Sequence, residues 1–209
     1  MQQDYGSVES NPYQRGWFVP NDIKGMLQLM GGDKKVIADL TSLFKHTPKN
    51  MMWSDYYNHA NEPVYHVSFL FNRLQAPWLI KKWSRAICRR AYHDGVAGRV
   101  GNEDIGQMSA WYILPAGGIY PIAFGSPPYE IASPMFSKFV IPRDPRYTSG
   151  IIFTIMAKNN SLENIYLQSA TLNGKPWPYC FITHTDIANG GILQLQMSKR
   201  PHENWGKSE

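Results

Sequence analysis

Cysteines, long apolar runs and leader-like segments are scarce or missing in this chain. Only two cysteines occur among its 209 residues, Cys88 and Cys180, and they lie far apart. Their spacing indicates neither a disulfide framework nor a zinc site. No apolar run reaches the ~18 residues of a membrane span. The first ten residues also lack the charged and apolar regions of a signal peptide.

Charged residues are few as well, and aromatic residues are abundant. Charged residues make up 18% of the chain and aromatic residues 13%, with seven tryptophans. This composition excludes a disordered chain, and the length is sufficient to bury a core. Aromatic faces stack well on sugar rings, although we expect most of these side chains to lie in the core.

The net charge of +5 is concentrated in one segment. Five basic residues within ten positions alternate with apolar ones: Lys81, Lys82, Arg85, Arg89 and Arg90. The spacing predicts an amphipathic helix with a solvated basic face. Nucleic-acid binding through this face is the alternative. Because no RNA-binding motif or zinc-finger spacing accompanies it, we expect no nucleic-acid partner.

The character of the sequence changes near residue 125. Helical patterns come first, over residues 12–19, 33–45, 63–73, 77–92 and 105–116. Short segments rich in β-branched and aromatic residues follow, over 129–131, 138–141, 151–157, 165–172, 180–183 and 192–197. We therefore predict an α+β fold, with a helical unit over residues 1–124 and a small antiparallel β-domain over residues 125–209.

Three alternate helices begin with acidic or amide side chains, in the segments 9–12, 61–63 and 101–104. In a barrel of paired helices, alternate helices run parallel, so their N-termini open at one rim. Helix N-termini favour negative groups, and carboxylate and amide oxygens suit a hard cation such as calcium. The alternative is ordinary capping, because Asp104 and Gln107 also fit a capping box.

Two of these carboxylates are candidates for glycoside hydrolysis. A protonated carboxyl can donate its proton to the leaving oxygen, while an ionised one activates water. Glu9 and Asp104 come from different helices, so they could face each other across a sugar. An inverting reaction requires the two groups to be roughly 6.5–9.5 Å apart.

Motifs along nearly the whole chain point to one family. They are Val8–Gln14, Asn61–Pro63 with His66, Gly101–Tyr112, Gly118–Pro121, Ala157–Ser161 and Ile182–His184. In these segments the chain resembles glycoside hydrolase family 92, the calcium-dependent exo-α-mannosidases. The resemblance implies a partial (α/α)6 barrel, about half of the toroid, followed by the β-domain. It also implies an inverting enzyme that removes terminal α-mannosyl residues, α-1,2-linked ones above all, from mannose-rich glycans.

The resemblance also implies roles for individual residues. Glu9 matches the general acid and Asp104 the general base, supported by the adjacent Asn102 in the catalytic set. Asn61 and Glu62 match the motif associated with Ca²⁺. The residues expected around the sugar are Trp17, Tyr65, His66, Glu103 and Gln107.

The chain departs from the family pattern in sequence and in length. Tyr65 replaces the first of two histidines after the calcium motif, and Ala60 replaces a glycine before it. Family members carry a β-sandwich and a complete barrel before this point. We therefore expect this chain to need the missing N-terminal region and to be inactive alone. The family resemblance suggests a periplasmic or secreted protein. The alternative to an enzyme is a carbohydrate-binding remnant of the family that has no catalytic activity.

Overall fold

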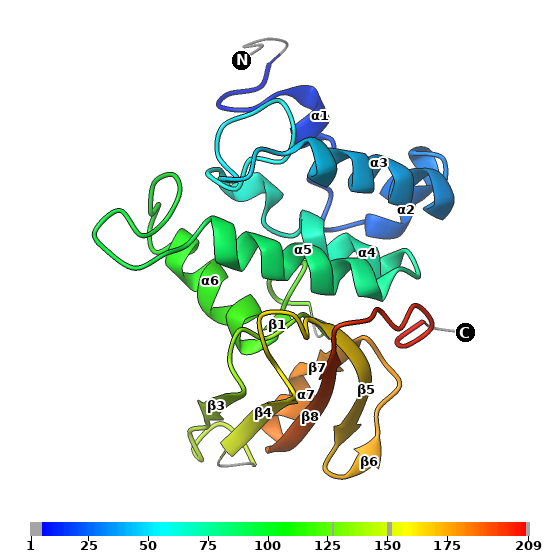
Figure 1. Ribbon diagram of the computed structural model, residues 1–209, viewed down its shortest axis with the longest axis vertical. Coiled ribbons are helices and arrows are strands. Elements are labelled where there is room, and N and C mark those ends of the chain that lie inside the picture. The colour runs from blue at the N-terminus through cyan, green and yellow to red at the C-terminus, as the bar shows by residue number, and fades with distance from the viewer. Residues whose placement is uncertain (1–5, 127, 150–151, 208–209) are drawn as a thin grey trace.

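The computed structural model describes residues 6–126, 128–149 and 152–207, in which most helices lie on one side and the strands, with one short helix among them, on the other (Figure 1). The helices are α1 (Pro12–Arg15), α2 (Ile23–Leu29), α3 (Asp33–His46), α4 (Leu70–Arg73), α5 (Pro77–Arg90), α6 (Gln107–Gly117) and α7 (His184–Ala188), with 3₁₀ turns η1 (Glu62–Val64) and η2 (Val67–Phe69). The strands are β1 (Ile119–Tyr120), β2 (Pro128–Ile131), β3 (Lys138–Pro142), β4 (Ile152–Lys158), β5 (Tyr166–Leu172), β6 (Lys175–Pro176), β7 (Phe181–Thr183) and β8 (Gly191–Ser198). The predicted mixture of helix and sheet is confirmed, while membership in an (α/α)6 barrel stays a prediction.

The helical half differs from the prediction at three places, the first being residues 12–19, of which only Pro12–Arg15 form a helix. Residues 63–73, predicted as one helix, form η1, η2 and the short α4. Helix α2 was not predicted, and it begins where the Asp22 side chain accepts a hydrogen bond from the Gly25 amide. Such a cap satisfies one of the unpaired amides at the start of a helix. In the described part of the chain, no helix has the length and apolarity required to cross a bilayer.

The strands form a three-stranded sheet, β1-β2-β7, and a five-stranded sheet, β3-β4-β8-β5-β6. The prediction of a purely antiparallel β-domain is wrong at one pair, because β4 and β8 run parallel. The last strand, β8, inserts between β4 and β5, and it is antiparallel only to β5. Residue pattern alone does not reveal such an insertion, since β8 pairs with partners that are 20 or more residues away along the chain.

Helix α5 lies between the two hydrophobic cores, one among the helices and one around the sheets. The predicted solvated basic face is wrong for two of its residues, since Lys81 and Arg85 are buried. The Lys81 ammonium donates to the Ile131 carbonyl, and Arg85 Nη2 donates to Asn160 Oδ1 at 2.6 Å. These cations face the β-half because its backbone and side-chain oxygens are there to accept hydrogen bonds.

A buried carboxylate lies at the same boundary. Glu130 of β2 is fully buried, and its Oε1 lies 2.5 Å from Arg73 Nη2. Asn72 Nδ2 donates to the other oxygen at 2.8 Å and also to the Cys180 carbonyl. Burial raises the pKa of Glu130, against the lowering effect of Arg73 and Asn72. An ion pair with hydrogen bonds therefore joins α4 to β2 and β7 across the boundary.

The C-terminal segment returns to α5 after β8 (Figure 1). Trp205 is buried in the core of the β-half, and Gly206 forms a parallel bridge with Tyr179. The Lys81 ammonium lies 5.4 Å from the Trp205 ring centre. Lys207 lies over Trp78 of α5 in the same manner, at 5.5 Å. This segment therefore covers part of the helix that separates the two cores.

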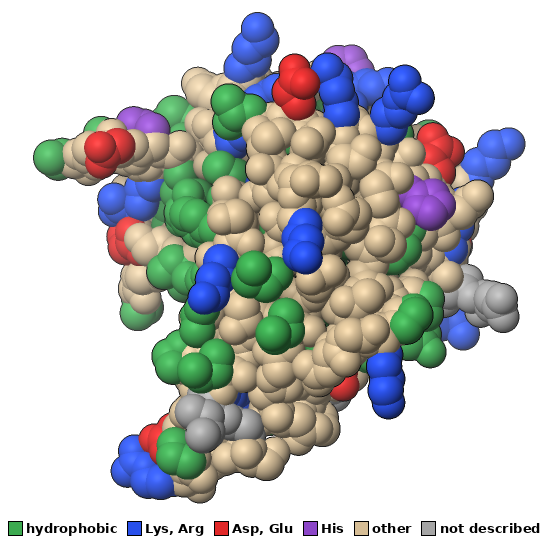
Figure 2. All heavy atoms as spheres, turned by 60° about the horizontal axis from the view of Figure 1, so that its bottom comes forward, with side chains coloured by type: hydrophobic (Ala, Val, Ile, Leu, Met, Phe, Trp, Pro, Cys, Tyr) green, Lys and Arg blue, Asp and Glu red, His purple; other side chains and the backbone are tan. Residues whose placement is uncertain are grey.

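The face over the sheets is seen in Figure 2. Most Lys and Arg side chains lie around the edge of this face, several of them close together at the top, and two lie near its middle. On α5 itself, Lys82, Arg89 and Arg90 remain exposed, while its other two cations turn inward.

Candidate active site

A cavity of about 820 Å³ collects several of the predicted site residues. We call it the Glu62 cavity. It is lined by segments that are distant in sequence: the residues after α1, the η1 turn, the loop before α6 and the segment after β1. The predicted residues among its lining are Glu62, Tyr65, His66, Asp104 and Gln107.

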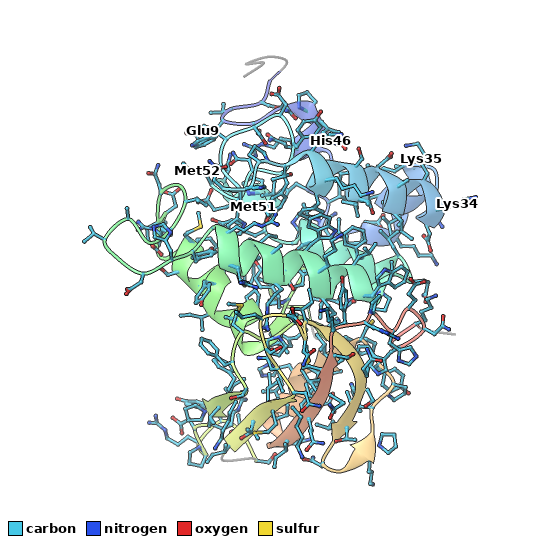
Figure 3. All side chains as sticks on the ribbon, viewed as in Figure 1. Glu9, Lys34, Lys35, His46, Met51 and Met52 are labelled. Carbon is cyan, nitrogen blue, oxygen red and sulfur yellow. The ribbon has the colours of Figure 1, made fainter. Side chains whose placement is uncertain are left out.

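The carboxylates of Glu62 and Asp104 line this cavity, while Glu9 lies outside the lining but close enough for its charge to act on Glu62. Burial raises the pKa of Glu62, and a hydrogen bond to the Asp104 side chain raises it further, as do the charges of Asp104 and Glu9. Glu62 Oε1 is buried and has no hydrogen-bond partner. Figure 3 shows Glu9 at the upper left, on the same side of the molecule as the loops that precede α6. Two of the three predicted acidic segments thus supply a carboxylate to the cavity lining, and the roles of Glu9, Glu62 and Asp104 stay predictions.

The loop before α6 presents Asp104 in a strained conformation. Asp104, Ile105 and Gly106 have consecutive positive φ angles of 42°, 61° and 80°. A β-branched residue rarely adopts this region, and such strain is concentrated at functional sites. The Asp104–Gln107 capping box is not formed, since α6 begins after Gly106 without a side-chain cap. Capping therefore does not explain the presence of Asp104.

Asn61 ties the first acidic segment to the second. Its Nδ2 donates to the Glu9 carbonyl at 3.0 Å, and the residue is buried. Asn61 precedes η1 but makes no capping hydrogen bond with its side chain. The main-chain position of Glu9, whose φ is 57°, is thus fixed beside the turn that carries Glu62.

Two buried aromatic side chains hold the cavity wall. Tyr65 directs its hydroxyl at the Met108 sulfur, 3.2 Å away, and burial raises its pKa. His66 Nε2 lies 2.7 Å from the Trp17 carbonyl, and because a carbonyl only accepts, Nε2 carries the proton. Burial lowers the pKa of His66, so the neutral ring is favoured. Trp17 is itself buried and does not line the cavity, and its role around the sugar stays a prediction.

The sequence of this chain matches the profile of the glycosyl hydrolase family 92 catalytic domain over residues 1–199. The chain belongs to glycoside hydrolase family 92. Two solved family 92 enzymes from Bacteroides thetaiotaomicron are similar in structure. An α-mannosidase is 32% identical with a TM-score of 0.87, and an inverting mannosidase is 31% identical with a TM-score of 0.84. Each alignment covers 96% of this chain, but only 26% and 29% of the respective enzyme.

A curated relative leads to the same family-level conclusion. An uncharacterized secreted glycosidase of Arthroderma benhamiae is 30% identical over 205 residues, which are 97% of this chain and 25% of the relative. This family 92 chain therefore spans about a quarter of the length of the relatives that it matches.

Asn102 and Glu103 of the family 92 chain lie beside Asp104 in sequence but do not line the Glu62 cavity. The Glu103 carboxylate accepts from the Ser109 amide at 3.0 Å and lies 2.7 Å from Arg99 Nε. The hydrogen bonds from Ser109 lower the pKa of Glu103, and the Arg99 charge adds to this effect. Glu103 therefore braces the loop in this conformation, and the predicted roles of both residues at the sugar stay predictions.

Several lining residues had no predicted role. Phe18 is half exposed and packs edge-on against His66, with ring centres 5.7 Å apart. Tyr120, Ile122 and Phe124 supply a second apolar wall. The sequence contained a signal for the second wall, because the family motif Gly118–Pro121 includes Tyr120. Together these residues give the acidic cavity an aromatic wall that suits a sugar ring.

Calcium fits the residues that the family 92 chain offers here. Glu62 presents a buried, unpartnered carboxylate oxygen, and Asn61 carries an amide oxygen on the same turn. Calcium binds six to eight oxygens of this kind, including water and substrate hydroxyls. Among the described residues, no group of three or more His, Cys, Asp or Glu side chains is arranged to hold a metal ion. The two side chains would therefore supply only part of a coordination shell.

Proposed function

We propose that this chain forms part of the catalytic site of an inverting, calcium-dependent exo-α-mannosidase. Its substrates would be terminal α-mannosyl residues of mannose-rich glycans, with α-1,2 linkages first among them. The observation that carries this proposal is the meeting of Glu62 and Asp104 at one cavity with an aromatic wall, with Glu9 close enough for its charge to act on Glu62. The two similar mannosidases of Bacteroides thetaiotaomicron support the choice of sugar.

In this proposal Glu9 donates a proton to the glycosidic oxygen as the bond to the sugar breaks. Asp104 takes a proton from the attacking water on the opposite face of the ring, with Asn102 next to it in the loop. Such a reaction requires the two carboxyl groups to be roughly 6.5–9.5 Å apart, so that water fits between them and the sugar. The reaction needs one of the two carboxyl groups protonated and the other ionised.

The remaining residues of the proposed site bind the sugar. Asn61 and Glu62 would hold Ca²⁺, which supplies positive charge for the sugar hydroxyls. The side chains proposed to contact mannose are Trp17, Tyr65, His66, Glu103 and Gln107. Because Tyr65 replaces a histidine of the family pattern, we expect it to influence linkage preference.

The test uses the enzyme that carries this chain together with the rest of the family's catalytic region. Mannose release from an α-1,2-mannobiose is followed by proton NMR, which shows whether the first product is the β-anomer. Glu9→Gln and Asp104→Asn should each reduce kcat at least 100-fold, the usual order for a general acid or base. Glu163→Gln and Asp144→Asn are matched controls, since both carboxylates are exposed and pair only with surface cations.

The outcomes separate the proposals. Retention of the α-anomer, or full activity in either variant or in chelator, would remove the mechanism. Mannose binding without hydrolysis, unchanged by Glu9→Gln, would instead identify a carbohydrate-binding remnant. The 209-residue chain alone should release no mannose.

The secreted relative supports a location outside the cytoplasm for the whole protein.

A further inference from the structure

A chain of hydrogen bonds through buried rings connects the two acidic segments of the site. Tyr57 Oη lies 2.7 Å from His59 Nδ1, and His59 Nε2 lies 2.9 Å from Tyr92 Oη. The Tyr92 hydroxyl in turn donates to the Met108 carbonyl at 2.9 Å. Tyr57 and His59 are fully buried. His59 stands two residues before Asn61, while Met108 stands four residues after Asp104.

The direction of each hydrogen bond in this chain is fixed by its last acceptor. The Met108 carbonyl can only accept, so it uses the single proton of the Tyr92 hydroxyl. The Tyr92 oxygen must then accept from His59 Nε2–H, which leaves Nδ1 as an acceptor for the Tyr57 hydroxyl. All polar atoms of these three side chains are thereby satisfied, as buried polar groups require.

This series of hydrogen bonds ends at Met108, in the first turn of α6, directly after the strained loop that contains Asp104. Met108 follows the three consecutive left-handed residues that include Asp104. Its sulfur is also approached by the hydroxyls of Tyr92 and Tyr65, each at 3.2 Å. At the other end of the loop, Gly101 lies so close to Ala60 that an added Cβ would be 2.6 Å from the Ala60 carbonyl oxygen. The loop is therefore held against residues 59–61 at both ends.

We propose that Tyr57, His59 and Tyr92 are positioning residues that fix the spacing between the Asn61–Glu62 turn and the Asp104 loop. The expected effect on catalysis rests on the proposed function, whereas the expected effect on the position of the Asp104 loop does not. If these side chains only had to fill space in the core, apolar side chains such as phenylalanine would be sufficient. Burying two hydroxyls and an imidazole is costly unless their hydrogen bonds are made, and here the last bond ends at the Met108 carbonyl, in the first turn of α6 directly after the loop.

Tyr92→Phe removes the hydroxyl shared by His59 and Met108 and keeps the ring. We expect kcat of the enzyme that carries this chain to fall about 10- to 100-fold, the range for displacing a catalytic group by about 1 Å. KM should stay within about twofold, because the cavity wall is unchanged. Tyr112→Phe is the matched control, since the Tyr112 ring packs at a tilt against Tyr92, with ring centres 4.8 Å apart, and lies outside the cavity lining; it should leave kcat unchanged.

Hydrogen exchange of the peptide that covers residues 99–110 measures how firmly the Asp104 loop is held, without reference to activity. Tyr92→Phe should accelerate exchange there, and Tyr112→Phe should not. Unchanged exchange and unchanged kcat in Tyr92→Phe would overturn the proposal, as would equal losses in the two variants. If the parent enzyme hydrolyses no mannoside, the proposed function fails. The exchange result alone then decides whether Tyr57, His59 and Tyr92 hold the Asp104 loop in place.

Discussion

The buried carboxylate of Glu130 gives the sharpest prediction about stability. Arg73→Met removes the guanidinium from a carboxylate that is fully buried in β2. Breaking a fully buried pair costs about 3–5 kcal/mol, whereas exposed pairs contribute about 0–1 kcal/mol. The Arg73 side chain is 37% exposed, so we expect about 2 kcal/mol. This corresponds to about 30-fold faster local opening of β2 and β7.

The pH dependence has a definite sign. The folded-state pKa of Glu130 is raised, chiefly by burial, so the ionised carboxylate destabilises the fold at neutral pH. That cost disappears as the pH falls through the raised pKa, because the carboxyl then becomes neutral. Arg73→Met raises the pKa of Glu130 further by removing an opposing charge. The difference between variant and parent should therefore be larger at neutral pH than at an acidic pH below the raised pKa.

Hydrogen exchange of peptides from β2 and β7, corrected for intrinsic rates, measures this opening. The double variant Arg73→Met/Glu130→Gln should recover most of the lost protection, because no unpaired charge remains buried. Arg89→Met is the control, since Arg89 is an exposed arginine of α5. The same acceleration at both pH values, or a double variant as open as the single one, would refute the reasoning.

Further predictions concern the core, the thiols and the site loop. Phe44→Ala should cost about 3–5 kcal/mol in free energy of unfolding, seen by thermal denaturation, because Phe44 is buried among three aromatic rings. Burial raises the pKa of Cys88 to about 12 and that of Cys180 to about 11, so an aromatic disulfide reagent at about pH 8 should label both rapidly only after unfolding. Gly101→Ala should lower kcat/KM by about tenfold or more through its clash with a neighbouring carbonyl. Gly95→Ala, which has a positive φ but open space around it, should have little effect on kcat/KM.

The sequence predicted α5 as a helix but not its surroundings. Spacing alone identified an amphipathic helix, and it assigned all five basic residues to the solvated face. Lys81 and Arg85 instead turn toward acceptors that lie 50 to 76 residues further along the chain. Local periodicity contains no information about such partners. The parallel pairing of β4 with β8 was missed for the same reason.

The sequence motifs identified Glu62 and Asp104, which line one cavity, and Glu9, whose charge acts on Glu62. Their catalytic and calcium-binding roles stay predictions. The helix-start argument was less accurate, because Glu62 begins a 3₁₀ turn and Asp104 lies in a left-handed loop before α6. The residues without a predicted role, Phe18 and Phe124, are exposed aromatics. Sequence gives no way to separate such residues from ordinary surface or core positions.

The returning C-terminal segment affects how this chain can be shortened. The family profile ends at residue 199, but the chain beyond it supplies Trp205 to the core of the β-half. A protein trimmed at the profile boundary would lose that indole and the aromatic face near the buried Lys81 ammonium. Without this segment, the part of α5 that it covers would be exposed to water. The folded unit therefore extends beyond residue 199, where the family profile ends.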